Sequence, residues 1–267
     1  METQARSGTY SQSLERGLAI LSSFRSGSPL LGVSDLAREV GLSRSTTHRY
    51  ISTLAALGYL QQDPASRKYR LGPRVLDLGF SAINSMDLRE LAAPHLQALS
   101  DETGRTVNMA VLDGTDIVYI ERCRTSQRGQ RDIDLNLHIG SRLPAYCTSM
   151  GKVLLAGLAP ELQREVLGQV QFTQRGPNAL TDVDELLAEL ERVRAAGLAV
   201  NNEELAYGLR SIAAPVRSQS GEVVAAINLA VHRTIVSLDS LVAHLGPQLK
   251  HTAAEISARI GHSPAGT

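Results

Sequence analysis

The sequence lacks tryptophan, has only two cysteines, and is poor in aromatic residues, which make up 4% of its 267 positions. Two cysteines, Cys123 and Cys147, are too few for a disulfide framework or a zinc site. The cores must therefore be built from Leu, Ala, Val and Ile. No apolar run approaches the ~20 residues that span a bilayer, and none follows a basic start, so we predict a cytoplasmic protein without a membrane segment.

Several motifs of catalysis and cofactor binding are also absent. The histidines are dispersed, no H-x-x-x-H or C-x-x-C unit occurs, and there is no G-x-G-x-x-G or P-loop lysine. The sequence therefore predicts no metal and no cofactor. A hydrolase with Cys147 or Ser149 as nucleophile, His138 as base and Asp132 or Asp134 as the group that orients it stays a remote alternative, because no G-x-S-x-G elbow fixes the nucleophile.

The net charge is zero, but the charges are distributed unevenly along the chain. Residues 1–90 hold 11 Lys and Arg against 8 Asp and Glu, whereas residues 91–267 hold 16 against 19. Within residues 34–74 the balance is 7 against 3. This asymmetry suits a protein that contacts nucleic acid through its N-terminal part alone.

The stretch from Ser34 to Leu71 has the pattern of two short helices, a turn and a β-hairpin. Ser34 is the predicted N-cap of the first helix, because its hydroxyl can accept from a free first-turn amide. Gly41 can take the positive φ that a helix-turn-helix needs, and Ser43 supplies the next cap. The second helix is predicted from Arg44 to about Leu57, with an inward face formed by Thr47, Ile51 and Leu54.

The outward face of that second helix carries side chains suited to DNA, namely Arg44, Ser45, Thr46, His48 and Arg49. Arginine matches guanine or phosphate, and short hydroxyls reach phosphates or base edges. A predicted hairpin of strands 59–62 and 68–71, turned at Asp63-Pro64, adds basic side chains beside the groove: Arg67, Lys68 and Arg70. These patterns predict a winged helix-turn-helix on double-stranded DNA; the alternative is a small solvated helical subdomain.

Two flanking helices complete the N-terminal part. A helix over 13–24 has an apolar stripe predicted to pack on the helix-turn-helix, formed by Leu14, Leu18, Leu21 and Phe24. After Gly72-Pro73, a linker helix carries a second stripe, formed by Val75, Leu76, Gly79, Phe80 and Ile83. We interpret the second stripe as a dimer seam, with packing on the same chain's own helix-turn-helix as the alternative.

The second half changes from helical to alternating periodicity at Thr106. Strands are predicted at 107–112, 116–122, 133–139, 198–202, 210–217 and 223–231, with turns at Asp113-Gly114 and Ser220-Gly221. Helices are predicted at 88–103, 149–157, 160–168, 182–196 and 238–260, the last kinked at Gly246-Pro247. This order indicates an α+β domain, an antiparallel sheet with helices on it.

A candidate ligand site lies at residues 143–152, LPAYCTSMGK. The helix predicted from Ser149 offers unpaired backbone amides, and Lys152 lies in the same turn, so a small carboxylate would fit there. The alternative is that Thr148 or Ser149 merely caps the helix. Further carboxylate partners, each more often simply solvated, are Arg122, Arg124, His138 and Arg142. Glu203-Glu204 is predicted at the exposed end of a strand.

The sequence resembles a known family in several places. GLSRSTTHRYISTLAALGYLQQDPASRKYRLG resembles the winged helix-turn-helix of the IclR family of bacterial transcriptional regulators, and SLERGLAILSSF resembles its first helix. LNLHIGSRLPAYCTSMGKVLLA, NNEELAYGLRSIAAPV and AAINLAV resemble its effector domain. The resemblance implies a DNA-binding domain (11–72), a linker helix (73–90) and a GAF-like effector-binding and oligomerisation domain (91–262), assembled as a homodimer or a dimer of dimers.

The resemblance also implies an effector pocket. By position it would be formed by Tyr146, Ser149, Met150, Asn201, Leu209, Ser211, Asn228 and Ala230. Asn201, Asn228 and Ala230 replace an acidic residue and two serines that some relatives use for very small acids. The sequence is similar to the subgroup that controls protocatechuate and 4-hydroxybenzoate catabolism, which implies an aromatic acid or a β-ketoadipate-pathway intermediate as effector. The alternative within the same architecture is a small oxoacid or another metabolite.

Overall fold

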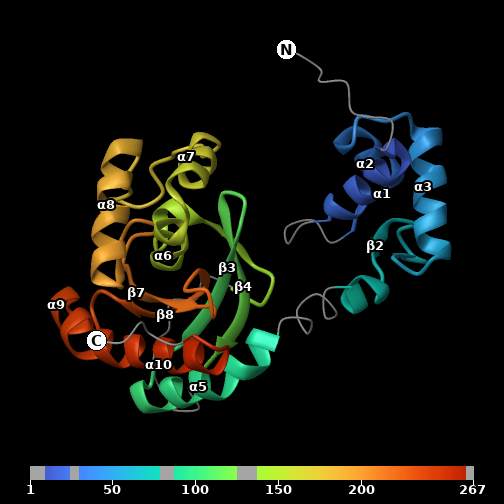
Figure 1. The fold of residues 1–267 in the computed structure, drawn as a ribbon. Coiled ribbons are helices and arrows are strands. Elements are labelled where there is room, and N and C mark those ends of the chain that lie inside the picture. The colour runs from blue at the N-terminus through green and yellow to red at the C-terminus, as the bar shows by residue number, and fades with distance from the viewer. Residues whose placement is uncertain (1–9, 25–29, 79–86, 125–136, 263–267) are drawn as a thin grey trace. The chain divides into compact units, whose positions relative to one another are not determined.

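The computed structural model describes residues 10–24, 30–78, 87–124 and 137–262. The chain divides into two compact units, residues 1–85 and 86–267, which we describe separately (Figure 1). Among the described residues, no helix is long and apolar enough to cross a membrane.

The N-terminal unit is the predicted winged helix-turn-helix. Its elements are α1 (Gln12–Ser22), α2 (Val33–Glu39), α3 (Arg44–Ala56), β1 (Leu60–Gln62) and β2 (Tyr69–Leu71). Gly41 adopts a φ of +66° between α2 and α3, and the Ser43 hydroxyl accepts from the Thr46 amide at the start of α3. A small core joins all five elements through Ile20, Leu36, Ile51, Leu60 and Tyr69.

One prediction about this unit was wrong, and a second holds only for Leu21 and Phe24, which pack against the core. The N-cap of α2 is Gly32, not Ser34, because the Asp35 carboxylate accepts from the Gly32 amide and closes the first turn two residues earlier. The predicted stripe of α1 is only partly buried: Leu14 and Leu18 are 63% and 54% exposed, and the buried residue is Ile20.

The linker prediction falls largely outside the described residues. Residues 74–78 are helical, as expected after Gly72-Pro73, but Gly79, Phe80 and Ile83 lie in the part that the structure does not describe. Leu76 is 60% exposed. The dimer-seam interpretation and the linker boundaries therefore stay predictions.

The C-terminal unit is built on one antiparallel sheet of six strands in the order β5-β4-β3-β8-β7-β6. The strands are β3 (Val107–Asp113), β4 (Asp116–Cys123), β5 (Arg142–Pro144), β6 (Ala199–Asn202), β7 (Leu209–Arg217) and β8 (Val223–His232). The predicted turns at Asp113-Gly114 and Ser220-Gly221 connect β3 to β4 and β7 to β8. The α+β fold class is confirmed.

The third strand differs from the prediction at 133–139. Residues 137–139 are not in a strand, and residues 133–136 lie outside the described part. The edge strand beside β4 is instead β5, in which Leu143 pairs with Ile117. The predicted strand is therefore wrong at residues 137–139, and the rest of its range stays a prediction.

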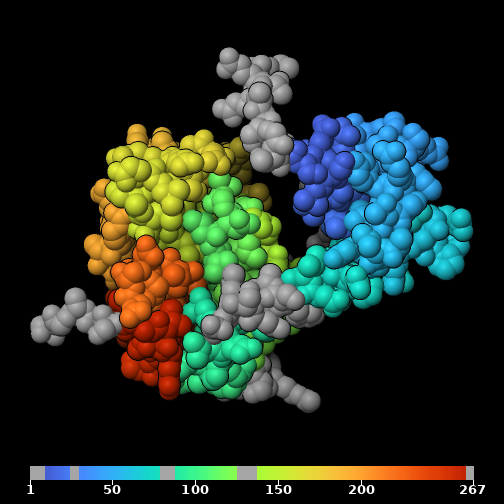
Figure 2. All heavy atoms as spheres, turned by 45° about the vertical axis from the view of Figure 1, so that its right-hand side comes forward, coloured from blue at the N-terminus to red at the C-terminus, as the bar shows by residue number. Residues whose placement is uncertain are grey.

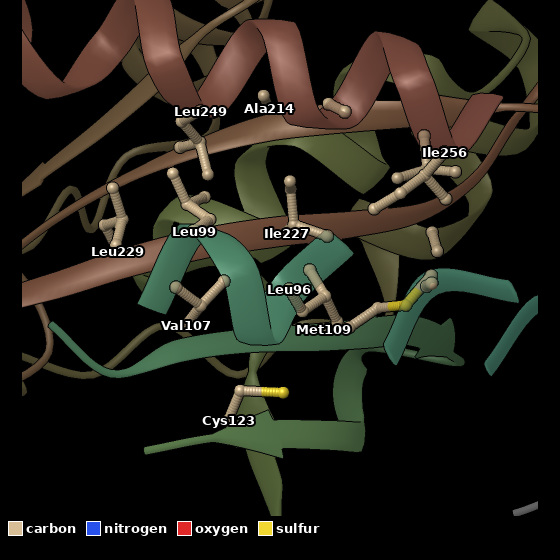
Figure 3. Close-up of a cluster of buried hydrophobic side chains, with 14 of the residues drawn as sticks. Leu96, Leu99, Val107, Met109, Cys123, Ala214, Ile227, Leu229, Leu249 and Ile256 are labelled. Atoms are coloured by element: carbon tan, nitrogen blue, oxygen red, sulfur yellow. The ribbon is translucent and has the colours of Figure 1, made fainter. Parts of the chain in front are cut away.

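One face of the sheet is sealed by two helices, α5 (Asp87–Thr103) and α10 (Gly246–Arg259). Figure 3 shows leucines and isoleucine of these helices pointing at strand side chains, with the labelled residues including Leu96, Leu99, Leu249, Ile256, Val107, Met109, Ile227 and Leu229. The closing helix is interrupted as predicted before Pro247: α9 (Leu238–Ser240) runs through a π-helical turn (Leu241–Leu245) into α10.

The other face is covered by α6 (Ser149–Gly157), α7 (Pro160–Gly168) and α8 (Val183–Ala196). The space-filling view shows these yellow and gold helices on the side of the unit opposite the teal α5 and red α10 (Figure 2). The predicted ranges of α6 and α7 agree with the structure, since Thr148 caps α6 and Pro160 starts α7. A 3₁₀ turn, Ala145–Cys147, leads from β5 into α6.

Candidate nucleic-acid interface and ligand cavity

The outward face of α3 presents the predicted DNA-contacting residues. Arg44, Ser45, His48 and Arg49 are exposed. Thr46 is half-buried, and its hydroxyl accepts from Ser43 at 2.8 Å, so it belongs partly to the N-cap. The first turn of α3 contains no acidic residue, which leaves its free amides open to a phosphate. These residues are arranged to meet DNA, and their contacts stay predictions.

The hairpin of β1 and β2 presents the second basic group. Asp63 accepts from the amides of Ala65 and Ser66 and so makes the turn. Arg67, directly after it, has a positive φ of 58°. Arg67, Lys68 and Arg70 are all exposed on this wing.

A cavity lies in the C-terminal unit between the sheet and the start of α6. Its polar lining comes from adjacent positions on neighbouring strands: Asn201 pairs with Ser211, and Asn108 pairs with both Asn228 and Arg122. Successive strand residues face opposite sides of a sheet, so these polar residues face α6 while their neighbours fill the core against α5 and α10. The face of the sheet toward α6 thereby carries a polar stripe.

The structure brings six of the eight predicted effector-site residues to this cavity: Ser149, Asn201, Leu209, Ser211, Asn228 and Ala230. Tyr146 and Met150 do not line it. The Tyr146 hydroxyl donates to the Thr173 carbonyl oxygen at 2.7 Å and lines a separate cleft, and Met150 is buried in the core between α6 and the sheet. Tyr146 and Met150, which the resemblance implied as pocket residues, are therefore not among the residues that line this cavity.

Further lining residues were not singled out as pocket residues from the sequence: Thr106, Asn108, Tyr119, Leu137, Thr148 and Leu205. Asn108 could have been predicted from the sequence, since an amide within the apolar stretch from Val107 to Val111 needs a hydrogen-bond partner when it is buried. Burial raises the pKa of the Tyr119 phenol to about 12, so its hydroxyl remains a hydrogen-bond donor across physiological pH.

Hydrogen bonds hold most of the polar lining in place. Asn108 Nδ2 donates to Asn228 Oδ1 at 2.8 Å, and Arg122 Nη1 donates to Asn108 Oδ1 at 3.1 Å. The hydroxyls of Ser149 and Ser211 lie 2.8 Å apart. The two strand amides and the guanidinium thus form one chain across β8, β3 and β4.

The N-terminus of α6 enters the cavity through Ser149. The Thr148 hydroxyl accepts from the Gly151 amide at 3.1 Å, which is the capping role considered for it. A Cβ atom at Gly151 would lie 2.1 Å from the Ala145 carbonyl oxygen, so only glycine fits there. Lys152 does not line the cavity, because its ammonium pairs with Glu204.

The remaining charged candidates take other places. Arg142 is paired with Asp113 and Asp116 on the β4–β5 edge, and His138 is hydrogen-bonded to Ser141. Arg124 is exposed. Glu203 and Glu204, predicted at an exposed strand end, are only 6% and 7% exposed. The Glu203 carboxylate accepts from the Gly208 amide of its own loop, and the Glu204 carboxylate pairs with Lys152 of α6.

Sequence comparisons decide the family. Residues 13–64 match the IclR helix-turn-helix domain, and residues 80–258 match the C-terminal domain of the bacterial transcriptional regulator IclR. The chain belongs to the IclR family. This IclR-family chain is 40% identical to the Pca regulon regulatory protein of Pseudomonas putida over 223 residues, which are 84% of this chain and 75% of that protein.

Two further IclR relatives are informative. The p-hydroxybenzoate hydroxylase transcriptional activator of Acinetobacter baylyi is 33% identical over 254 residues, covering 95% of this chain and 93% of that one. An IclR homologue from Microbacterium hydrocarbonoxydans, solved in complex with 4-hydroxybenzoate, superposes with a TM-score of 0.79 at 25% identity, covering 93% of this chain and 99% of that one. The IclR-family chain is accordingly a DNA-binding transcriptional regulator.

The geometry of the described residues in this IclR chain does not support the hydrolase alternative. Burial raises the pKa of the Cys147 thiol to about 11, so it is not a thiolate nucleophile at neutral pH. The His138 ring nitrogen Nδ1 lies 2.7 Å from the Ser141 hydroxyl, and Ser149 pairs with Ser211. Asp132 and Asp134 lie outside the described residues.

Proposed function

We propose that this IclR-family regulator binds a hydroxylated aromatic acid, or an acid of the β-ketoadipate pathway, in the cavity of its C-terminal unit, and that the acid controls operator binding. The observation that carries the proposal is the composition of the cavity. Arg122 is the one charged side chain among the described lining residues, and the other polar groups are amides and hydroxyls. Such a lining suits a ligand with one carboxylate and one hydroxyl.

The roles of the lining follow from its chemistry. The Arg122 guanidinium would pair with the carboxylate, because it supplies the positive charge of the lining, and the bond from its Nη1 to Asn108 fixes its position. Asn201 and Asn228 are neutral and can meet a ring hydroxyl as donor or acceptor. Leu205, Leu209 and Ala230 offer apolar surface to the ring.

A small oxoacid is the competing effector. It would pair with Arg122 equally well but would leave the leucines of the cavity without a contact, so it would gain little from apolar burial. The Pca and p-hydroxybenzoate relatives, and the 4-hydroxybenzoate complex, favour the aromatic acid.

A thermal-shift panel tests the choice of ligand. The purified full chain would be melted with 4-hydroxybenzoate, protocatechuate, β-ketoadipate, glyoxylate and pyruvate. A ligand at 100 times its dissociation constant stabilises the unit that binds it by about 2.7 kcal/mol, which moves the melting temperature by several degrees. We expect shifts with the aromatic acids or β-ketoadipate. A shift with the oxoacids alone would contradict the proposal.

Substitution of Arg122 tests the site. Arg122→Gln should abolish the shift, whereas Arg142→Gln, which removes an arginine paired with Asp113 on the β4–β5 edge, should leave it intact. If both variants still respond, the acid binds elsewhere.

We also propose that the chain acts as a homodimer or a dimer of dimers on double-stranded DNA, and not as an enzyme. One recognition helix covers a single half-site, so two copies spaced by about one turn of DNA are needed for useful affinity. Sedimentation of the protein with and without a palindromic operator measures this. A 1:1 complex of one chain with the full operator would contradict it.

A further inference from the structure

A six-residue strap, residues 203–208, connects β6 to β7 beside the cavity. Its two ends are tied together: the Glu203 amide donates to the Leu209 carbonyl oxygen at 2.7 Å, and Glu203 Oε2 accepts from the Gly208 amide at 2.9 Å. Leu205, within the strap, lines the cavity. The strap therefore forms part of the cavity wall without belonging to a strand.

A buried ion pair joins this strap to α6. Lys152 Nζ lies 2.7 Å from Glu204 Oε1 and 3.4 Å from Glu189 Oε1. The Lys152 side chain is 1% exposed and that of Glu204 is 9% exposed. Lys152 lies three residues after Ser149 on α6, so the pair is close to the cavity but outside it.

Burying this ion pair costs free energy of desolvation. Burial raises the pKa of the Glu204 carboxyl, which Lys152 opposes, and Glu204 Oε2 has no hydrogen-bond partner among the described residues. Well-packed apolar side chains would hold two elements together at least as well. What an ion pair at 2.7 Å adds is a defined position for each partner.

The position of Glu204 in turn fixes Asn201, which lines the cavity. The Glu204 amide donates to Asn201 Oδ1 at 3.3 Å, and Asn201 Nδ2 donates to the Cys147 carbonyl oxygen at 2.6 Å, just before α6. Both ends of this cavity amide are thus fixed by the two segments that Lys152 and Glu204 join. Displacing Glu204 would release Asn201 and Leu205 together.

We propose that the Lys152–Glu204 ion pair holds the strap closed over the cavity, so that Lys152 and Glu204 are positioning residues for effector binding although neither lines the cavity. The effector consequence rests on the proposed function, but the closure of the strap does not. If loss of the ion pair leaves the strap closed in only 1–10% of molecules, the apparent affinity for the effector falls about 10- to 100-fold.

The test removes both charges at once, in the Lys152→Met/Glu204→Gln double variant, because a single removal would isolate a buried charge and endanger the fold. Urea unfolding first establishes that the double variant and the wild type are both folded. Amide hydrogen exchange of residues 203–208 is then compared between the two proteins, each as the ligand-free full chain. Arg142→Gln is the matched control, since it breaks a 2.7 Å ion pair with Asp113 in the same unit.

The expected result is faster exchange of the Glu203, Glu204 and Gly208 amides in the double variant alone, with a 10- to 100-fold weaker affinity for 4-hydroxybenzoate in calorimetry. Unchanged exchange overturns the proposal. Faster exchange with unchanged affinity overturns the positioning role. A wild-type protein that binds none of 4-hydroxybenzoate, protocatechuate and β-ketoadipate contradicts the proposed function instead, and the exchange comparison then decides the closure of the strap by itself.

Discussion

The outer face of α3 and the cavity of the C-terminal unit use polar side chains in opposite ways. On α3 the candidate side chains are mostly exposed, and the core lies behind them at Ile51. In the cavity Asn108, Asn201 and Asn228 are between 1% and 5% exposed and are held by hydrogen bonds. A surface that reads DNA can therefore change without disturbing the fold, whereas the cavity cannot change without altering stability.

Among the polar side chains of the two surfaces, the largest effect on stability is expected inside the cavity. Asn228→Ala leaves the Asn108 amide without its 2.8 Å partner and should lower the free energy of unfolding by about 1–3 kcal/mol. Urea unfolding measures this. The Asn108→Ala/Asn228→Ala double variant should lose less than the sum of the single losses, because it removes both partners. Additive losses would show that the two amides do not depend on each other.

On α3 the expected effect is on DNA alone. Arg49→Ala should weaken operator binding by about 1–3 kcal/mol if Arg49 reads a guanine, and should change stability by no more than about 0.5 kcal/mol. Fluorescence anisotropy with operator and random DNA measures the binding. Ile51→Ala is the matched control on the inner face and should lower stability by about 2–5 kcal/mol. An equal binding loss on random DNA would assign Arg49 to phosphate.

A pH titration extends the comparison to the wall behind the cavity. Burial raises the pKa of Cys147 from 9.0 to about 11. The folded state therefore favours the neutral thiol. The contribution of the thiol to the free energy of unfolding is complete below pH 9 and is lost as the pH rises from 9 to 11. The loss is about 1 kcal/mol at pH 10. Chemical unfolding of Cys147→Ala should show a shallower alkaline decline than wild type. Identical declines would mean that the Cys147 thiol has the same pKa in the folded and the unfolded chain.

The smallest effect is expected on the wing. Lys68 is exposed, and Lys68→Ala should reduce the slope of log affinity against log salt by about one unit with little change in stability. Operator binding over a salt series measures the slope. A slope equal to that of the wild type would remove Lys68 from the DNA interface.

Local rules predicted most of the secondary structure. The bounds of α6 and α7 followed from a threonine cap and a proline start, and the hairpins followed from glycine turns. The prediction of Ser34 as N-cap was wrong because two positions could begin the helix. The Asp35 carboxylate accepts from the Gly32 amide, and the helix therefore begins at the earlier position. Such a choice depends on how the preceding residues enter the helix, which a single sequence does not specify.

The site was predictable where it lies on strands and less so elsewhere. A strand alternates strictly, so Asn201, Ser211 and Asn228 came to one face as expected. Tyr146 lies in a 3₁₀ turn and Glu204 in a loop, where no period fixes the direction of a side chain. The burial of Glu204 depends on Lys152, 52 residues earlier in the chain, and no local pattern contains that pairing.

The fit of Gly151 against Ala145 has a practical consequence for anyone redesigning this regulator as a biosensor. The helix side of the cavity cannot accept a bulkier residue at position 151 without moving the chain, since a Cβ atom would lie 2.1 Å from the Ala145 carbonyl oxygen. New ligand preference must therefore come from the strands. A combinatorial library at Leu209 and Ala230, the apolar strand positions of the lining, changes the cavity while the hydrogen-bonded amides keep their places.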